Sequence, residues 1–255
     1  MLEIKNLRKS FAGFQVLKGV NLTIPKESMT FIMGGSGTGK SVLLKHIVGL
    51  LKPDEGEIWF EGQDITKLSE RELQIVRKKI GLLFQEGALF DSMTVFENVA
   101  FPLVEHSRMS SKEIKLKVEE LLQAVELLSA KDKFPSELSG GMRKRAALAR
   151  TLALNPQVIL FDEPTTGLDP ILQITIMELI KKIKETFKLT CVVISHDLIL
   201  ALKFAEKIAF LHEGVVVEEG DPEKIRHAAH PFVRKFVESA LLDKKFETKE
   251  VEHEL

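Results

Sequence analysis

The chain is poor in the residues and segments that mark secreted or membrane-spanning proteins. It has one cysteine and no tyrosine in 255 residues, so an internal disulfide framework is excluded. Cys191 stands in an apolar run, which predicts a small buried hydrophobe rather than a reactive thiol. The first residues lack the charged and apolar regions of a signal peptide. No stretch approaches the ~18 apolar residues of a membrane span, so we expect a cytoplasmic protein.

An excess of charge of one sign is also missing. The 36 basic and 37 acidic residues give a formal net charge of -1. The chain therefore has no basic excess that would indicate binding to nucleic acid, and no acidic tail that would indicate a cationic partner. Hydrophobic residues make up 44% and charged residues 29% of the chain, as in soluble globular proteins. The length allows one large α/β domain, or a core with a smaller satellite.

Short apolar runs alternate with helical patterns along the chain, in the order typical of an α/β fold. The run at 29–33 is continuous and predicts a buried parallel strand. Apolar residues at helical spacing follow at 42–50, and the stretch 96–154 is mostly helical in pattern. Two further runs rich in β-branched residues, at 158–161 and 191–194, flank another helical segment.

A glycine-rich octapeptide after the first buried strand carries the strongest chemical signal. It matches G-x-x-x-x-G-K-[ST] in the strand–loop–helix context of a phosphate-binding loop. Its backbone N–H groups and the helix N-terminus can surround phosphate oxygens. The lysine can reach the β- and γ-phosphates of ATP, and the serine hydroxyl can ligate Mg²⁺. The predicted ATP-binding residues are Gly34, Gly35, Ser36, Gly37, Thr38, Gly39, Lys40 and Ser41.

Two carboxylates, Asp162 and Glu163, follow directly after the apolar run at 158–161. In a P-loop site the first is expected to hold Mg²⁺. The second is expected to position or polarise the attacking water, for which it must stand within one hydrogen bond. A solvated acidic turn is the alternative for this pattern alone, and the phosphate-binding loop favours the catalytic interpretation.

A second anion-binding helix end is predicted at Ser139, Gly140, Gly141 and Met142, ahead of an alanine-rich helix. The serine can cap that helix, and the glycines allow a close backbone approach. One chain rarely needs two such ends for one phosphate group. We therefore expect the second end to bind a nucleotide held by another copy of the chain, although a simple capped helix start explains this motif taken alone.

The order of these three motifs, with Gln85, Asp169 and His196, resembles an ABC-type ATPase, the nucleotide-binding subunit of an ABC transporter. The resemblance covers about residues 2–240. It implies a P-loop NTPase (RecA-like) core of the α/β class, with an N-terminal antiparallel β-subdomain and an inserted helical subdomain at about 86–154. A charged tail at 241–255 is less similar to the family.

The resemblance also assigns roles to single residues. Phe11 would stack on adenine, and Gln85 would contact Mg²⁺ and the attacking water and link the site to the helical subdomain. Asp169 would lie at the dimer interface, and His196 would hydrogen-bond the γ-phosphate. Most of the family has glutamine where this chain has Met142, so the polar contacts that the glutamine amide makes are not expected here. The implied Mg²⁺ ligands are Ser41, Gln85 and Asp162; the implied catalytic residues are Glu163, His196 and Gln85.

The segment 84–103 is rich in apolar residues, and in the family this region receives a helix of the membrane permease. We expect the permease to dock near Gln85–Phe101. The stretch Gly87–Phe90, with Leu138–Met142, resembles Mla-type phospholipid-transport ATPases. The resemblance implies a dimer on the cytoplasmic face of the inner membrane, connected through its permease to periplasmic or outer-leaflet lipid-binding components.

Three other functions are open. An importer ATPase for a small soluble substrate is the alternative that the sequence separates least well. A non-transport ABC protein acting on DNA or ribosomes would need tandem cassettes or a long coiled-coil insertion, and the stretch from Gln85 to Ser139 is too short for one. A P-loop kinase would have no use for the motif at 138–142.

Overall fold

The computed structural model describes residues 2–85 and 87–241, so the charged tail from 242 onward lies outside the described residues. The strands are β1 (Leu2–Phe11), β2 (Phe14–Ile24), β3 (Met29–Met33), β4 (Glu55–Phe60), β5 (Gln63–Asp64), β6 (Ile80–Leu83), β7 (Val158–Asp162), β8 (Thr190–Ile194), β9 (Lys207–His212) and β10 (Val215–Gly220). The α-helices are α1 (Lys40–Ile47), α2 (Glu70–Lys79), α3 (Val95–His106), α4 (Ser111–Ala124), α5 (Gly140–Leu152), α6 (Pro170–Phe187), α7 (Leu198–Phe204) and α8 (Pro222–Arg226), and a last helix runs over 231–241.

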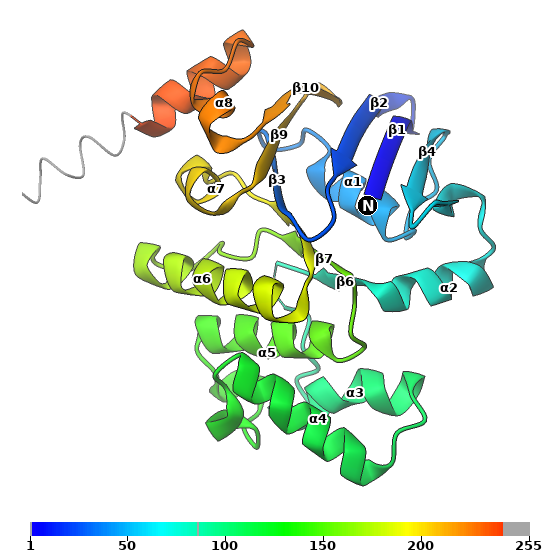
Figure 1. The fold of residues 1–255 in the computed structure, drawn as a ribbon, viewed down its shortest axis with the longest axis vertical. Coiled ribbons are helices and arrows are strands. Elements are labelled where there is room, and N and C mark those ends of the chain that lie inside the picture. The colour runs from blue at the N-terminus through cyan, green and yellow to red at the C-terminus, as the bar shows by residue number, and fades with distance from the viewer. Residues whose placement is uncertain (1, 86, 242–255) are drawn as a thin grey trace, which may run out of the picture.

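Two sheets form the framework. The larger has the strand order β10-β9-β3-β8-β7-β6, in which only the edge strand β10 pairs antiparallel with its neighbour. The smaller has the order β2-β1-β4-β5 and is antiparallel. The expected P-loop core with an N-terminal antiparallel subdomain is therefore confirmed, and Figure 1 shows the two sheets flanking α1.

The central strands β3, β7 and β8 of the larger sheet are buried on both faces, as the continuous apolar runs predicted. Side chains alternate along each strand, so Phe31 of β3 joins one apolar cluster and Ile32 joins the other. Val193 and Val192 of β8 divide in the same way. One cluster extends into α3–α6, and the other extends to α1 and the small sheet. The sheet is therefore the wall between two halves of the core.

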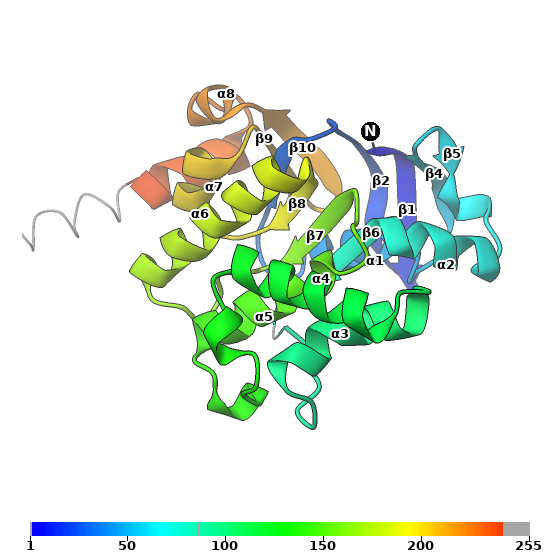
Figure 2. The ribbon, with the colours of Figure 1, turned by 60° about the horizontal axis from the view of Figure 1, so that its bottom comes forward.

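Helices α3, α4 and α5 pack together below the sheets in Figures 1 and 2, within the segment expected to be the helical subdomain. Alanines on α5 are fully buried, which lets α3 approach closely. Each of α2, α3 and α4 begins with a capping box in which a serine or threonine pairs with the glutamate three residues later. The sequence S/T-x-x-E therefore sets where these helices start.

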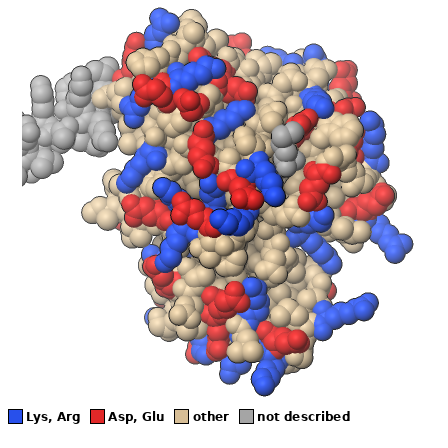
Figure 3. Space-filling view, in the orientation of Figure 1, with Lys and Arg blue, Asp and Glu red and all other residues tan. Residues whose placement is uncertain are grey.

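Cys191 lies in the centre of β8 and is buried, as the sequence predicted. Burial raises the pKa of its thiol to about 12, so the reactive thiolate is suppressed. No described helix is long and apolar enough to cross a membrane. On the face shown in Figure 3, basic and acidic side chains are interspersed.

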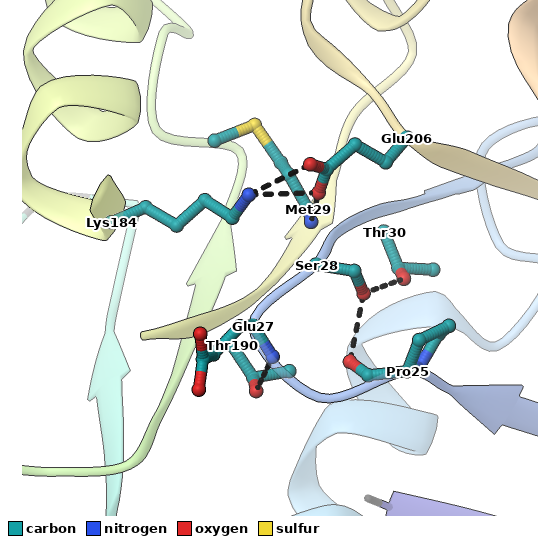
Figure 4. A network of polar contacts seen from close by, with 8 residues as sticks. All are labelled: Pro25, Glu27, Ser28, Met29, Thr30, Lys184, Thr190 and Glu206. Carbon is teal, nitrogen blue, oxygen red and sulfur yellow. Dashed lines mark hydrogen bonds and ion pairs between the residues drawn. The ribbon is translucent and has the colours of Figure 1, made fainter. Parts of the chain in front are cut away.

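A polar network ties the amino ends of the central strands to α6 and to the loops beside them (Figure 4). Glu206 accepts a hydrogen bond from Met29 N at 2.6 Å, and both its oxygens lie 2.9 Å from Lys184 Nζ of α6. Thr190 Oγ1 accepts from the backbone N–H of Glu27 at 2.8 Å. These bonds fix the start of β3 and β8, and therefore also where their carboxyl ends lie.

Replacement of this carboxylate should destabilise the fold more than loss of its ion pair. Glu206→Ala leaves Met29 N–H without its acceptor, which costs about 1–3 kcal/mol and lowers the thermal midpoint by about 5 °C. Lys184→Met keeps that hydrogen bond and should cost less than about 1 kcal/mol. Thermal unfolding of both variants measures the difference; equal losses would contradict a role for the Met29 bond.

Candidate functional site

The phosphate-binding loop joins β3 to α1 and has glycine where no other residue fits. Gly34 has φ +154°, and a Cβ there would lie 2.3 Å from the carbonyl oxygen of Leu211. Gly39 has φ +100°, and its Cβ would meet the side chains of Val16 and Leu17 at 3.0 Å. Both positions therefore require glycine, for backbone conformation and for space.

Lys40 lies inside the loop that precedes it. Its ammonium donates hydrogen bonds to the carbonyl oxygens of Gly34 at 2.9 Å and Gly35 at 2.8 Å. Burial lowers the pKa of this amine, and the negative charges of Glu163 and Asp162 offset part of that effect. The loop therefore encloses the Lys40 ammonium, and two nearby carboxylates help to keep this amine protonated.

The acidic end of β7 faces the start of α1. Asp162 Oδ1 accepts a hydrogen bond from Ser41 Oγ at 3.3 Å. The pKa of the Asp162 carboxyl is raised, mainly because the group is buried. The hydrogen bond from Ser41 opposes this shift, and the negative charge of Glu163 adds to it. The Ser41 hydroxyl and the Asp162 carboxylate therefore lie side by side beside the loop, and both are oxygen ligands of the kind that hard cations prefer.

Glu163 is held by contacts on both its backbone and its side chain. Its φ is 48°, and its N–H donates to the carbonyl of Ile194, the last residue of β8, at 3.1 Å. Its Oε2 accepts from Thr166 Oγ1 at 2.8 Å and lies 3.6 Å from His196 Nδ1. The sequence reasoning missed Thr166, although a hydroxyl three residues after the glutamate was visible there.

An open depression of about 570 Å³ lies beside the loop. It is lined by Val16, Ser36, Gly37, Gly39, Lys40, Ser41, Val42, Glu163 and His196. The structure thus brings the loop, the glutamate and the histidine together from three separate parts of the chain. Phe11, Gln85, Asp169 and the motif at 139–142 are not among the described residues that line it.

The remaining predicted residues lie at the ends of other elements. Phe11 ends β1 and is 42% exposed. Gln85 is exposed after β6, and its backbone carbonyl accepts a hydrogen bond from Lys144 of α5. This contact connects the loop after β6 to the helical layer. Asp169 caps α6 by accepting from the N–H groups of Ile171 at 3.1 Å and Leu172 at 3.0 Å.

The second predicted anion-binding end is the N-terminus of α5. Ser139 is exposed, and its Oγ accepts from Met142 N at 3.3 Å, as the cap prediction requires. The side chain of Met142 packs against the larger apolar cluster, which explains how a thioether is tolerated there. A Cβ at Gly141 would meet nothing within 4 Å, so packing inside this chain does not require glycine.

Comparison with known proteins matches this arrangement to one family. The ABC transporter family profile matches residues 17–166. MlaF of Haemophilus influenzae, an intermembrane phospholipid transport ATP-binding protein, is 47% identical over 225 residues, which are 88% of this chain and 85% of that protein. The chain belongs to the ABC transporter family. The mkl protein of Mycobacterium leprae, a probable ribonucleotide transport ATP-binding protein, is 42% identical over 236 residues, covering 92% of this chain and 68% of that one.

A solved structure agrees with the family assignment. The dimer of a related ATP-binding cassette, in a post-hydrolysis state with ADP and Pi, superposes with a TM-score of 0.79 at 39% identity. The match covers 87% of this chain and 99% of that chain. This member of the ABC transporter family therefore has the cassette fold, binds ATP and has ATPase activity.

The raised pKa of Asp162 predicts how this ABC ATPase responds to pH without nucleotide. Since the folded-state pKa exceeds the unfolded value, stability falls as pH rises through that interval, and the ionised carboxylate is a net cost at neutral pH. Asp162→Asn removes the charge and can still accept from Ser41. We expect its thermal midpoint at pH 7 to rise by about 2 °C, a small gain because the group is partly screened.

Thermal unfolding of the nucleotide-free protein between pH 7 and pH 4 measures this effect. The difference in thermal midpoint between Asp162→Asn and the wild type should shrink as pH approaches the ordinary aspartate pKa of about 3.9. Asp91→Asn, at an exposed position, is the control. A lower midpoint for Asp162→Asn at pH 7 would contradict the electrostatic account.

Proposed function

We propose that this ABC ATPase energises the movement of phospholipids between membranes, from the cytoplasmic face of the inner membrane. The observation that supports this cargo most directly is the 47% identity with MlaF of H. influenzae across 88% of the chain. Import of a small soluble substrate is the second candidate, because the mkl protein of M. leprae is 42% identical over 92% of the chain.

The loop Gly34–Ser41 is proposed to hold the phosphates of ATP. An incoming anion would give the Lys40 ammonium a charged partner in place of the two loop carbonyls that it now contacts. Ser41 and Asp162 fit a Mg²⁺ site, with Gln85 as a further proposed ligand, because Mg²⁺ takes few protein ligands together with phosphate oxygens. When bound, the ion would neutralise charge that develops on the phosphates.

Glu163 is proposed to orient the water that attacks the γ-phosphate. Its carboxylate is fixed by Thr166 and by the backbone contact to β8, so one oxygen can accept from water without a change of rotamer. His196 lies in the turn between β8 and α7, 3.6 Å from that carboxylate. From there its ring can donate to the γ-phosphate, while Gln85 is proposed to contact the attacking water.

A second copy of the chain is proposed to complete each site with Ser139–Met142. Three features support this: the exposed Ser139, the open space at Gly141, and the related cassette that is dimeric. Asp169 is proposed to lie at the same interface. Ile171, two residues further on, is 78% exposed, and a large exposed apolar side chain at that place is consistent with a partner.

The permease is proposed to dock near Gln85–Phe101. Phe84 and Phe90 are 40% and 43% exposed, so large apolar side chains are presented to a partner there. The segment is also held firmly. The Asn98 side chain, fully buried, bonds the backbone of Phe90 at 2.8 Å and 3.1 Å, and Arg150 donates to the carbonyl of Gly87 at 2.8 Å. Lipid-binding components beyond the membrane would connect through that permease.

Replacement of the proposed catalytic glutamate should separate ATP binding from hydrolysis. Glu163→Gln keeps the size of the side chain and an oxygen for Thr166, but it loses the charge that polarises water. We expect the ATPase rate to fall by roughly 10²–10⁴-fold, ATP affinity to persist, and a closed dimer to accumulate with ATP. Phosphate release and size-exclusion chromatography measure the two effects.

The matched control is Glu213→Gln. Glu213 also has φ 48°, so this variant makes the same change on the same backbone conformation, and it should hydrolyse ATP at the wild-type rate. A wild-type rate for Glu163→Gln would show that the catalytic assignment is wrong.

The cargo is tested by purifying the protein with its membrane partners and identifying the lipids that copurify. A lipid-transport complex should carry phospholipids and a lipid-binding component. A permease for a soluble substrate without any lipid-binding component would contradict the proposed cargo and favour the second candidate.

A further inference from the structure

The hairpin of β1 and β2 ends in two exposed phenylalanines beside the depression. Ala12 and Gly13 form its two-residue turn with φ 48° and 83°, the combination of a type I′ turn. Phe11 and Phe14 are the last cross-strand pair before this turn. Phe14 is 72% exposed, and no ring among the described residues stacks on it.

The two phenylalanines lie on one face of the hairpin. Side chains directly opposite each other in an antiparallel pair project to the same side, so Phe14 shares its side with Phe11. Phe11 also follows Lys9 by two residues, so these two side chains lie on one side of β1. Lys9 is paired with Leu17 of β2, which therefore projects to the same side.

Contacts of Leu17 and Val16 show that this is the face toward the phosphate-binding loop. Val16 lines the depression, and its side chain would lie 3.0 Å from a Cβ on Gly39. Leu17 would lie at the same distance from that atom, because a register shift after Lys9 turns both residues toward the loop. The ring of Phe11 belongs to this side as well, since the Lys9 ammonium is 5.5 Å from its centroid.

The direction of a bound nucleotide follows from the walls of the depression, on the proposed function. Glu163 and His196 would face the γ-phosphate, and the loop surrounds the phosphates. Two lining residues remain: Val42, which continues the loop into α1, and Val16 of the hairpin. Among the described residues, the hairpin is therefore the one further element at the depression, and the base is expected to leave the phosphates on that side. Aromatic faces bind any nucleotide base by stacking.

We propose that Phe14 is a second base-binding residue, which with Phe11 forms an aromatic platform for adenine at the end of the hairpin. This inference rests on the proposed nucleotide site and adds a contact to it. Phe11 carries no hydroxyl, so it can hold the base only by its π-face and by apolar contact. A second ring at Phe14 would add a further contact of the same kind.

Calorimetric titration of the full chain with ATP and with inorganic tripolyphosphate tests the proposal, because tripolyphosphate has no base. Phe14→Ala should weaken ATP binding about tenfold, the loss of part of one stacking contact, and leave tripolyphosphate binding unchanged. Phe14→Trp should restore ATP affinity. Ile75→Ala removes another exposed apolar side chain, at a 61% exposed position on α2, and should change neither affinity.

Two outcomes would overturn this inference alone: a Phe14→Ala protein with wild-type ATP affinity, or an equal loss for both ligands, which would indicate a disturbed hairpin. A wild-type protein that binds neither ligand would overturn the proposed nucleotide site itself, and this inference with it.

Discussion

The site depends first on the parallel pairing of β3, β8 and β7. Parallel strands end at the same edge of a sheet, so the loop after β3, the histidine after β8 and the carboxylates ending β7 meet there. The pairing of Asp162 with Ile194 places the first carboxylate in register, and the N–H bond from Glu163 to that same residue continues the contact by one step. Residues more than a hundred positions apart thus share one depression.

Because these segments meet at one edge of the sheet, the Lys40 ammonium lies close to the carboxylates of Asp162 and Glu163. The Lys40 ammonium is held among carbonyl oxygens in a partly dry loop, which disfavours its charge, and Asp162 and Glu163 compensate only in part. The same burial disfavours the ionised form of Asp162. On the proposed function, phosphate would offset the cost of burying the ammonium, and a cation would offset the cost of burying the carboxylate. A metal-bound polyphosphate would therefore relieve both.

Local patterns in the sequence predicted the parts of the fold that local physics determines. The continuous apolar runs predicted β3, β7 and β8 as buried strands, and the motif at 34–41 predicted the loop between β3 and α1. What joins them could not be predicted in the same way. No local pattern indicates that Glu206 bonds Met29 N, or that a register shift turns Val16 toward the loop, because these contacts join segments far apart in the sequence. Thr166 is different, because it stands three residues after Glu163 and its hydrogen bond is therefore local. The family resemblance, rather than periodicity, indicated Gln85, Asp169 and His196.

The same distinction explains why one chain shows only part of the proposed site. Ser139 and Asp169 each use a side-chain oxygen to cap their own helix, so within this chain both residues have a complete local function. A Cβ at Gly141 would meet no atom of the described part of the chain within 4 Å, so packing inside the chain does not require glycine there. On the proposed function a second copy uses these helix ends, because caps that orient a helix N-terminus also aim its free N–H groups outward at an anion. The helix caps are thus explained by local structure, and on the proposed function the dimer places one of these helix ends against the nucleotide of the other copy.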